Sequence, residues 1–264
     1  MPISVDHRRP PAPVTPAMKH LVRRLARSAG LYVTRYPPPE TLGFHLKQLT
    51  RRLGINCVLD VGAHEGGYAR LLREDVRFAG EIVSFEPAAP SFAALCSARA
   101  GDRHWRGHEY ALGRTAGKAT MSVFAESELN TLLEPSSYGI DRFPTMSRPL
   151  HGQMVEVRPL AEVFDQVTAH VPDPRVLLKV DTQGFDLEVV EGAAEVLGRV
   201  RALQLEVPVK HVYDGMPTLP QTLERLTELG FEVTGMFPVT RDRDLLRVVE
   251  FDCVLRADRE VPAA

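Results

Sequence analysis

Short apolar runs alternate with amphipathic segments of helical length from Asn56 onward. Seven runs predict strands, at residues 57–61, 81–86, 108–112, 176–181, 202–207, 231–236 and 248–255. The segments between them predict helices near residues 67–74, 90–99, 159–167, 185–197 and 218–229. This alternation indicates the α/β class, with a mostly parallel seven-stranded sheet and helices on both of its faces.

A polar segment interrupts this pattern between two stretches of alternating apolar residues, at 119–124 and 153–158. A connection of that length without structure of its own is uncommon inside a domain. We therefore predict a substrate lid or a binding loop here. The segment contains Asn130, Ser136, Ser137 and Pro144.

The N-terminal extension has a different pattern. Residues 1–16 contain five prolines and little apolar periodicity, which predicts disorder. Residues 17–28 place apolar side chains at helical spacing among basic ones, which predicts a basic amphipathic helix. Its apolar positions are Met18, Leu21, Val22 and Leu25. We expect the helix to pack on the flank of the domain, and a peripheral contact with a membrane surface or a glycolipid is the alternative.

Length and composition allow one sizeable core. The chain has 264 residues, of which 44% are hydrophobic, and a further helix is predicted at residues 41–53. We therefore expect an extension over residues 1–40, one α/β domain over residues 41–258 and a tail over residues 259–264.

Charge and cysteine content narrow the classes of partner. With 32 basic and 34 acidic residues the net charge is −2, so no overall field favours nucleic acid or an anionic membrane. No apolar stretch approaches the roughly 20 residues that span a bilayer, and no signal-peptide core is present. The cysteines Cys57, Cys96 and Cys253 are far apart, and we interpret them as buried thiols. These features predict a cytoplasmic protein.

The motif VLDVGAHEGGY at residues 58–68 carries an apolar strand into a glycine-rich turn and a helix. Gly62 permits a tight turn and Gly66 permits close packing of the helix start, which would leave backbone amides facing a ligand. His64 stands where a dinucleotide-binding G-x-G-x-x-G fingerprint needs glycine. The turn therefore disfavours a pyrophosphate-binding dehydrogenase and still suits a nucleoside ligand.

An acidic residue, Glu86, ends the next predicted strand. Its carboxylate can accept both hydroxyls of a ribose, and a solvated strand-end charge is the alternative. Asp60 can hold the ammonium group of a methionine moiety. A ribose-binding carboxylate without a pyrophosphate loop favours S-adenosyl-L-methionine over NAD. The predicted cofactor-binding residues are Asp60, Gly62, Ala63, His64, Gly66, Tyr68, Glu86, Pro87 and Ala111.

Three candidate catalytic residues follow the fourth and fifth predicted strands. Methyl transfer to a hydroxyl needs an aligned acceptor and a group that draws away its proton. Asp181 ends the fourth strand, which we expect beside the cofactor strand, and is predicted to act as base or substrate anchor. Glu206 ends the next strand, and His211 follows in a loop expected at the same edge. The alternatives are a surface histidine and carboxylates that pair with Lys179 or Lys210.

Taken together, these motifs resemble the FkbM family of S-adenosylmethionine-dependent methyltransferases over roughly residues 41–258. The resemblance implies a Rossmann-like class I methyltransferase fold and O-methylation of sugars and natural products. The combination of a Tyr-Pro segment near the N-terminus with the SFEP and DTQGFD motifs is similar to bacterial members thought to methylate deoxysugars on glycolipids or oligosaccharides. The matching motifs are DVGAHEG (60–66), SFEP (84–87), ALG (111–113), LKVDTQGFD (178–186), EGA (191–193) and LEV (205–207).

Two positions depart from the family pattern. The family usually has asparagine where His64 stands, which leaves the cofactor contact of this side chain open. It often has Asp-x-Glu-Gly-x-Glu where residues 181–186 read DTQGFD, and this change removes one carboxylate from a cluster suited to a divalent cation. We therefore predict no metal-binding residues and do not favour a divalent cation. Asp186 is a secondary metal or substrate candidate.

The function expected from these residues is O-methylation of a hydroxyl on a saccharide, glycolipid or related natural product. One alternative is methylation of a polyketide, another small-molecule hydroxyl or a nitrogen, although the chain lacks an Asn/Asp-Pro-Pro-Tyr motif. Another is a cofactor-binding protein without catalysis. A nicotinamide-dependent oxidoreductase is disfavoured because His64 replaces the required glycine. The sequence predicts no particular oligomeric state.

Overall fold

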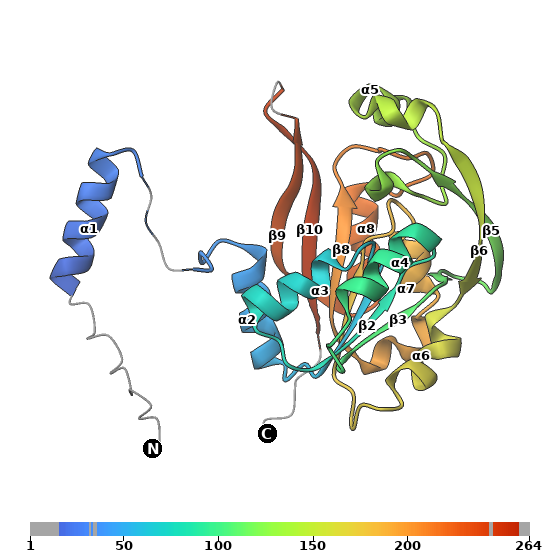
Figure 1. The fold of residues 1–264 in the computed structure, drawn as a ribbon, viewed down its shortest axis with the longest axis horizontal. Coiled ribbons are helices and arrows are strands. Elements are labelled where there is room, and N and C mark those ends of the chain that lie inside the picture. The colour runs from blue at the N-terminus through green and yellow to red at the C-terminus, as the bar shows by residue number, and fades with distance from the viewer. Residues whose placement is uncertain (1–15, 32, 34–35, 243–244, 259–264) are drawn as a thin grey trace, which may run out of the picture. The chain divides into compact units, whose positions relative to one another are not determined.

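The chain divides into two units, residues 1–39 and residues 40–264, in a computed structural model that describes residues 16–31, 33, 36–242 and 245–258. In the first unit, helix α1 (Pro16–Ser28) matches the predicted helix and begins one residue earlier (Figure 1). The predictions of disorder for residues 1–16 and of a tail at 259–264 lie outside the described residues, except at Pro16, which begins α1 and was wrongly predicted to be disordered. No described helix is long and apolar enough to span a membrane.

In the second unit, the described residues form a main sheet of seven strands in the order β3-β2-β1-β7-β8-β10-β9. β10 runs antiparallel to both of its neighbours, and the other pairs are parallel. The predicted mostly parallel seven-stranded sheet is therefore confirmed. The strands are β1 (Cys57–Val61), β2 (Glu81–Phe85), β3 (Trp105–His108), β7 (Val176–Val180), β8 (Val200–Pro208), β9 (Phe231–Asp242) and β10 (Arg247–Ala257).

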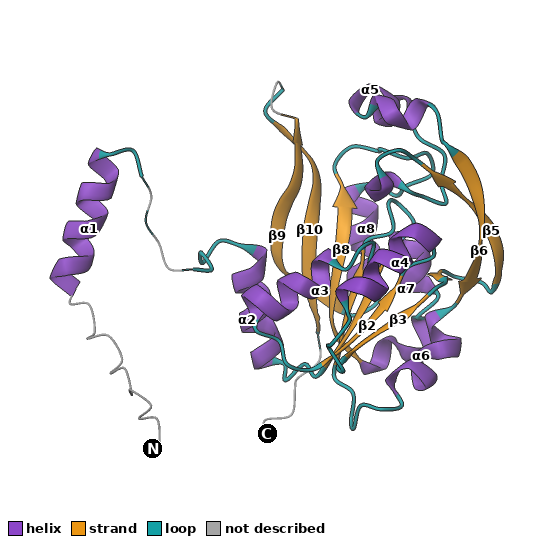
Figure 2. Cartoon of the chain, viewed as in Figure 1, coloured by secondary structure: helices purple, strands orange, loops and turns teal. Residues whose placement is uncertain are grey.

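Helices cover both faces of this sheet (Figure 2). Successive side chains of each buried strand point to opposite faces of the sheet, so Leu59 of β1 packs in one core and Val58 packs in the other. The first core contains residues of α6, α7 and α8, and the second contains residues of α2, α3 and α4. These helices are α2 (Leu42–Arg52), α3 (Gly67–Leu71) with a π-helical continuation (Leu72–Val76), α4 (Ala89–Ala98), α6 (Leu160–Thr168), α7 (Asp186–Glu191) with a 3₁₀ segment at Ala194–Arg199, and α8 (Leu219–Glu228).

A second, three-stranded sheet contains β4 (Ala111–Leu112), β6 (His151–Arg158) and β5 (Gly117–Val123) in that order. The polar connection between β5 and β6 includes helix α5 (Ser137–Arg142) and short 3₁₀ turns at Ser127–Leu129 and Pro144–Ser147. Figure 1 shows this sheet and α5 beside the main sheet.

Two details of the sequence-based prediction are wrong. The predicted strand 108–112 is divided, because β3 ends at His108 and the residues of β4 pair with β6 in the other sheet. β3 reads WRGH, whose single apolar residue gave no strand pattern, whereas the apolar residues downstream did. The prediction of buried thiols holds for Cys57 and Cys253, but Cys96 on α4 is only half-buried.

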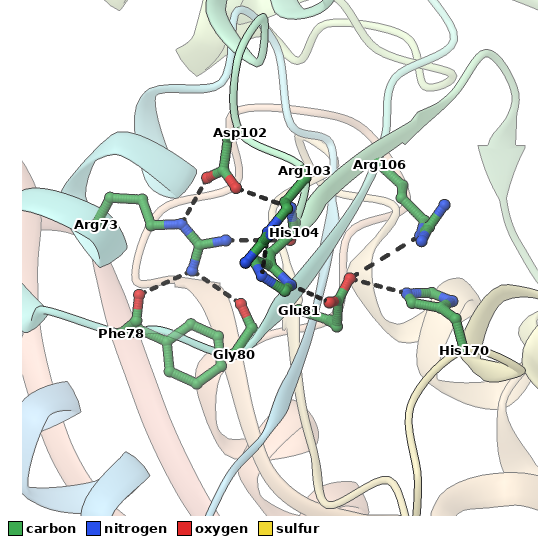
Figure 3. A network of polar contacts seen from close by, with 9 residues as sticks. All are labelled: Arg73, Phe78, Gly80, Glu81, Asp102, Arg103, His104, Arg106 and His170. Atoms are coloured by element: carbon green, nitrogen blue, oxygen red, sulfur yellow. Dashed lines mark hydrogen bonds and ion pairs between the residues drawn. The ribbon is translucent and has the colours of Figure 1, made fainter.

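A polar network fixes the edge of the sheet at which β2 and β3 begin (Figure 3). Arg73 donates to the carbonyl oxygens of Phe78 and Gly80 and pairs with Asp102 at 2.7 Å. Glu81, the first residue of β2, is contacted by the imidazoles of His104 and His170. This network holds the connections around β2 at the end of the strand opposite Glu86.

Because β1 is buried on both faces, we expect Leu59→Ala to lower the free energy of unfolding by about 2–5 kcal/mol. The lost side chain leaves a cavity in the core beside β7. Urea denaturation measures the change. Leu150→Ala, at an exposed position, is the matched control and should change stability by less than about 0.5 kcal/mol. Equal effects of the two variants would contradict the assignment of the core.

Candidate functional site

A cavity of about 410 Å³ opens beside the turn that follows β1. Its volume lies in the range typical of small-molecule sites, roughly 300–1,000 Å³. Val61 of β1 pairs with Phe85 of β2 and with Val180 of β7, so the residues that follow these strands share one edge. The chain order reverses at β1, and open α/β sheets bind ligands at such an edge. The cavity is lined by this edge and by residues of the connection between β5 and β6, including Ser127, Asn130 and Leu132.

Glycine is required in the turn because the chain closes tightly against the end of β7. Gly62 has φ 69°, and a Cβ atom there would lie 1.8 Å from the carbonyl oxygen of Asp181. The N–H groups of Gly62 and Ala63 both donate to the carbonyl of Phe85, at 3.0 and 3.1 Å. The amides of Gly62 and Ala63 are therefore occupied by β2. The turn instead places its carbon atoms and the following residue at the cavity.

His64 continues the turn in a left-handed conformation, with φ 48°. Asparagine and histidine are both enriched among the non-glycine residues that adopt it, so the departure from asparagine preserves the backbone. The backbone N–H of His64 donates to Oε2 of Glu86 at 2.8 Å. Its Nε2 lies 2.8 Å from Oγ of Ser127. The imidazole therefore joins the turn to the segment between β5 and β6.

Glu86 lines the cavity and is only 6% exposed. Burial raises the pKa of this carboxyl, and the N–H groups of Ala88 and His64 act in the opposite direction. Ala88 donates to Oε1 at 2.8 Å, so each carboxylate oxygen accepts one backbone hydrogen bond. Each oxygen keeps a second lone pair, which allows Glu86 to bind two hydroxyls of a ligand.

Asp60 and Lys179 form a buried ion pair below the turn, with 3.0 Å between Oδ1 and Nζ. The ammonium group of Lys179 also donates to the carbonyls of Val61 and Gly62, at 3.3 and 3.0 Å, and lies 3.6 Å from Asp181. Burial alone would lower the pKa of Lys179, but the carboxylates of Asp60 and Asp181 raise it above its usual value. Lys179 is therefore a permanent cation that links β1 to β7.

Gln183 joins two of the predicted catalytic carboxylates. Its Nε2 donates to Oδ1 of Asp181 and to Oε2 of Glu206, both at 3.2 Å. Its Oε1 accepts from the hydroxyl of Tyr213 at 2.8 Å, and its backbone carbonyl accepts from the hydroxyl of Thr131 at the same distance. With φ 53°, Gln183 also bends the chain after β7. The amide thus holds Asp181 and Glu206 at a fixed spacing.

A second hydrogen-bonded chain lies on the cavity wall. The hydroxyl of Tyr68 donates to Oε1 of Gln204 at 2.7 Å, and Nε2 of Gln204 donates to Oδ1 of Asp252 at 2.9 Å. All three residues line the cavity. Gln204 and Asp252 were not predicted from the sequence, although a glutamine inside the apolar run ALQLEV was a usable signal.

Several carboxyl groups near Asp181 have raised pKa values. Burial and the neighbouring carboxylate of Asp181 raise the pKa of Asp186 to about 7, and the same causes raise that of Glu250 to about 7. Burial is also the largest cause for Glu206, whose pKa lies well above its usual value. In the part of the chain that the structure describes, no group of three or more histidine, cysteine or acidic residues is placed to hold a metal ion.

The structure brings most of the predicted site residues together. The residues of the prediction that line the cavity are Gly62, Ala63, His64, Tyr68, Glu86, Pro87, Ala111 and Asp181. Glu206 contacts the site through Gln183. Gly66 packs against the ring of Trp105, where a Cβ atom would lie 2.6 Å from the ring. His211 is exposed and does not line the cavity; its carbonyl accepts from the hydroxyl of Ser136 at 2.6 Å.

The raised pKa of Glu250 gives a stability prediction that is independent of activity. Because the pKa of Glu250 is higher in the folded than in the unfolded protein, protonation of Glu250 stabilises the fold. This contribution is complete below about pH 4.5 and is lost as the pH rises through about 7. Glu250→Gln removes the titration. Relative to the unmodified protein, the variant should gain roughly 1–3 kcal/mol in free energy of unfolding between pH 5 and pH 8.5.

Urea denaturation at several pH values measures this difference. The exposed substitution Glu224→Gln is the matched control and should follow the unmodified protein at every pH. A constant offset between Glu250→Gln and the unmodified protein across the pH range would show that Glu250 does not titrate near neutrality.

One family model and several solved structures are similar to this chain. A family model described as the Methyltransferase FkbM domain matches residues 60–233. No curated protein matches the chain. A structure of Methyltransferase FkbM from Methylobacillus flagellatus KT is 14% identical, with a TM-score of 0.46, and the match covers 76% of this chain and 43% of that one. The chain thus spans less than half the length of that protein.

Two further solved structures are similar at lower identity. Precorrin-6y C5,15-methyltransferase from Geobacter metallireducens GS-15 is 11% identical with a TM-score of 0.41, covering 85% of this chain and 94% of that one. LepI in complex with SAM is 11% identical with a TM-score of 0.40, covering 92% of this chain and 53% of that one. The Rossmann-like fold itself is shown by the mostly parallel main sheet with helices on both faces. The family model matches more than half of the residues of this chain, and the chain therefore belongs to the FkbM family of methyltransferases.

Proposed function

We propose that this protein transfers a methyl group from S-adenosyl-L-methionine to a hydroxyl of a saccharide, a glycolipid or a related natural product. The observation that carries the proposal is the buried Glu86 carboxylate at the cavity, with one free lone pair on each oxygen beside the glycine turn. When bound, the cofactor supplies a methyl group on a sulfonium centre. The protein's own residues bind it, orient the acceptor and take up a proton.

On the cofactor side, Glu86 would accept the two ribose hydroxyls. The apolar residues Ala111, Met121 and Leu132 line the same cavity and suit an adenine ring. Asp60 is buried against Lys179 and does not line the cavity, so it is poorly placed to hold the ammonium group of the methionine moiety. Asp252 lines the cavity and is oriented by Gln204, which makes it the better candidate for that contact.

On the acceptor side, Asp181 would draw the proton from the hydroxyl as the oxygen attacks. It lines the cavity, and its two oxygens are held by different partners, Oδ2 by Lys179 and Oδ1 by Gln183. This fixed orientation suits a general base. The exposed position of His211 gives no support to its predicted role, so we assign the base to Asp181 alone.

Glu86→Gln should weaken binding of S-adenosylhomocysteine by roughly tenfold to a hundredfold, because an amide can no longer accept hydrogen bonds at both of its polar atoms. Isothermal titration calorimetry measures this affinity. Asp181→Asn is the control and should bind S-adenosylhomocysteine with an affinity within a few-fold of that of the unmodified protein. Tight binding of NAD without binding of S-adenosylhomocysteine would overturn the assignment of the cofactor.

Asp181→Asn should lower the turnover number by about 10²–10⁴, because the hydroxyl then keeps its proton as the new bond forms. The measurement is mass spectrometry of glycolipids and oligosaccharides carrying deoxysugars, followed for the gain of one methyl group. His211→Ala is the matched control and should keep full turnover. Loss of turnover in His211→Ala with full turnover in Asp181→Asn would show that His211, and not Asp181, acts as the base.

A further inference from the structure

Helix α1 carries an exposed apolar stripe. Met18, Leu21, Val22 and Leu25 follow the i, i+3, i+4, i+7 spacing that places side chains on one face of a helix. Their exposed fractions are 53%, 57%, 46% and 61%, which are large values for side chains of this kind. A helix of 13 residues is about 20 Å long, so the stripe is long enough to lie along a surface.

The charged residues of α1 are all basic. The helix contains Lys19, Arg23, Arg24 and Arg27 and no acidic residue, in a chain that has slightly more acidic than basic residues overall. At roughly 100° per residue, His20 and Arg27 project from the side opposite the apolar stripe and Arg24 projects from its flank, and all three are exposed. Positive charge on one side and aliphatic side chains on the other define a basic amphipathic helix.

We propose that α1 binds the surface of a membrane that contains anionic lipids. The helix would lie in the plane of the interface, with Leu21, Val22 and Leu25 inserted below the headgroups. The basic side chains would lie at the level of the lipid phosphates, where the negative surface potential attracts them. Charge complementarity selects this occupant, because a neutral apolar partner would leave the four Lys and Arg charges unmatched. This interaction does not depend on the proposed methyl transfer.

The test uses the full chain and two kinds of vesicle, phosphatidylcholine alone and phosphatidylcholine mixed with phosphatidylglycerol. Co-sedimentation should show binding to the anionic vesicles, weaker binding at high salt, and little binding to the neutral ones. Leu21→Glu combined with Leu25→Glu should lower the partition coefficient by at least about tenfold, because charged side chains cannot enter the apolar layer.

Matched variants separate the contribution of charge. Arg24→Glu combined with Arg27→Glu should lower binding to anionic vesicles by at least about tenfold, whereas Arg24→Lys combined with Arg27→Lys should retain it. Leu150→Glu, at an exposed position of the second unit, should leave binding unchanged. Equal binding to both kinds of vesicle, or binding to neither, would overturn the proposal.

Unfolding curves and light scattering complete the experiment. The Leu21→Glu and Leu25→Glu variant should unfold at the same urea concentration as the unmodified protein and keep the same mass in solution. A lower midpoint would show that the stripe packs against the chain itself. A change in mass would show that it pairs with a second copy, and either result would contradict membrane binding.

Discussion

The site depends on one buried ammonium group. Lys179 lies between the carboxylates of Asp60 and Asp181 and donates to two carbonyls of the turn after β1. A buried charge is tolerated only when partners replace its hydration, and here carboxylates and carbonyls from two adjacent strands do so. Without Asp60, Lys179 would keep only the more distant and partly exposed carboxylate of Asp181. The position of the turn and the orientation of Asp181 are therefore set by the same side chain.

Asp181 contacts both the turn after β1 and Lys179. The carbonyl of Asp181 is so close to Gly62 that no side chain fits there, while the carboxylate of Asp181 pairs with Lys179. The proposed cofactor side and the proposed acceptor side thus meet at the ends of β1 and β7. Gln183 extends the arrangement to β8 by donating to both Asp181 and Glu206. A third carboxylate in its place would add repulsion, whereas the amide N–H groups provide attraction to both neighbours.

The sequence predicted those parts of the site that follow directly from strand order. An apolar run followed by a polar residue identifies the end of a buried strand, so the edge positions of Glu86 and Asp181 were correct. Contacts made by side chains from distant segments were not predictable in this way. The hydrogen bonds of Gln183 to Glu206 and Tyr213 join residues that are 23 and 30 positions apart in the sequence. Local patterns of apolar and polar residues do not predict contacts of this kind. The direction of His211 was missed because a loop has no periodicity that would fix it.

The carboxyl groups around Asp181 are costly for the fold. Asp186, Glu206 and Glu250 are desolvated and repel one another when ionised, which is why their pKa values are raised. Apolar residues at the same positions would avoid this cost, as buried charged groups can often be replaced without loss of stability. Strongly perturbed acids next to a cavity are more typical of binding and catalysis than of structural support. The energetic cost of these three groups thus favours a chemical use for this edge of the sheet, where Asp181 lines the cavity.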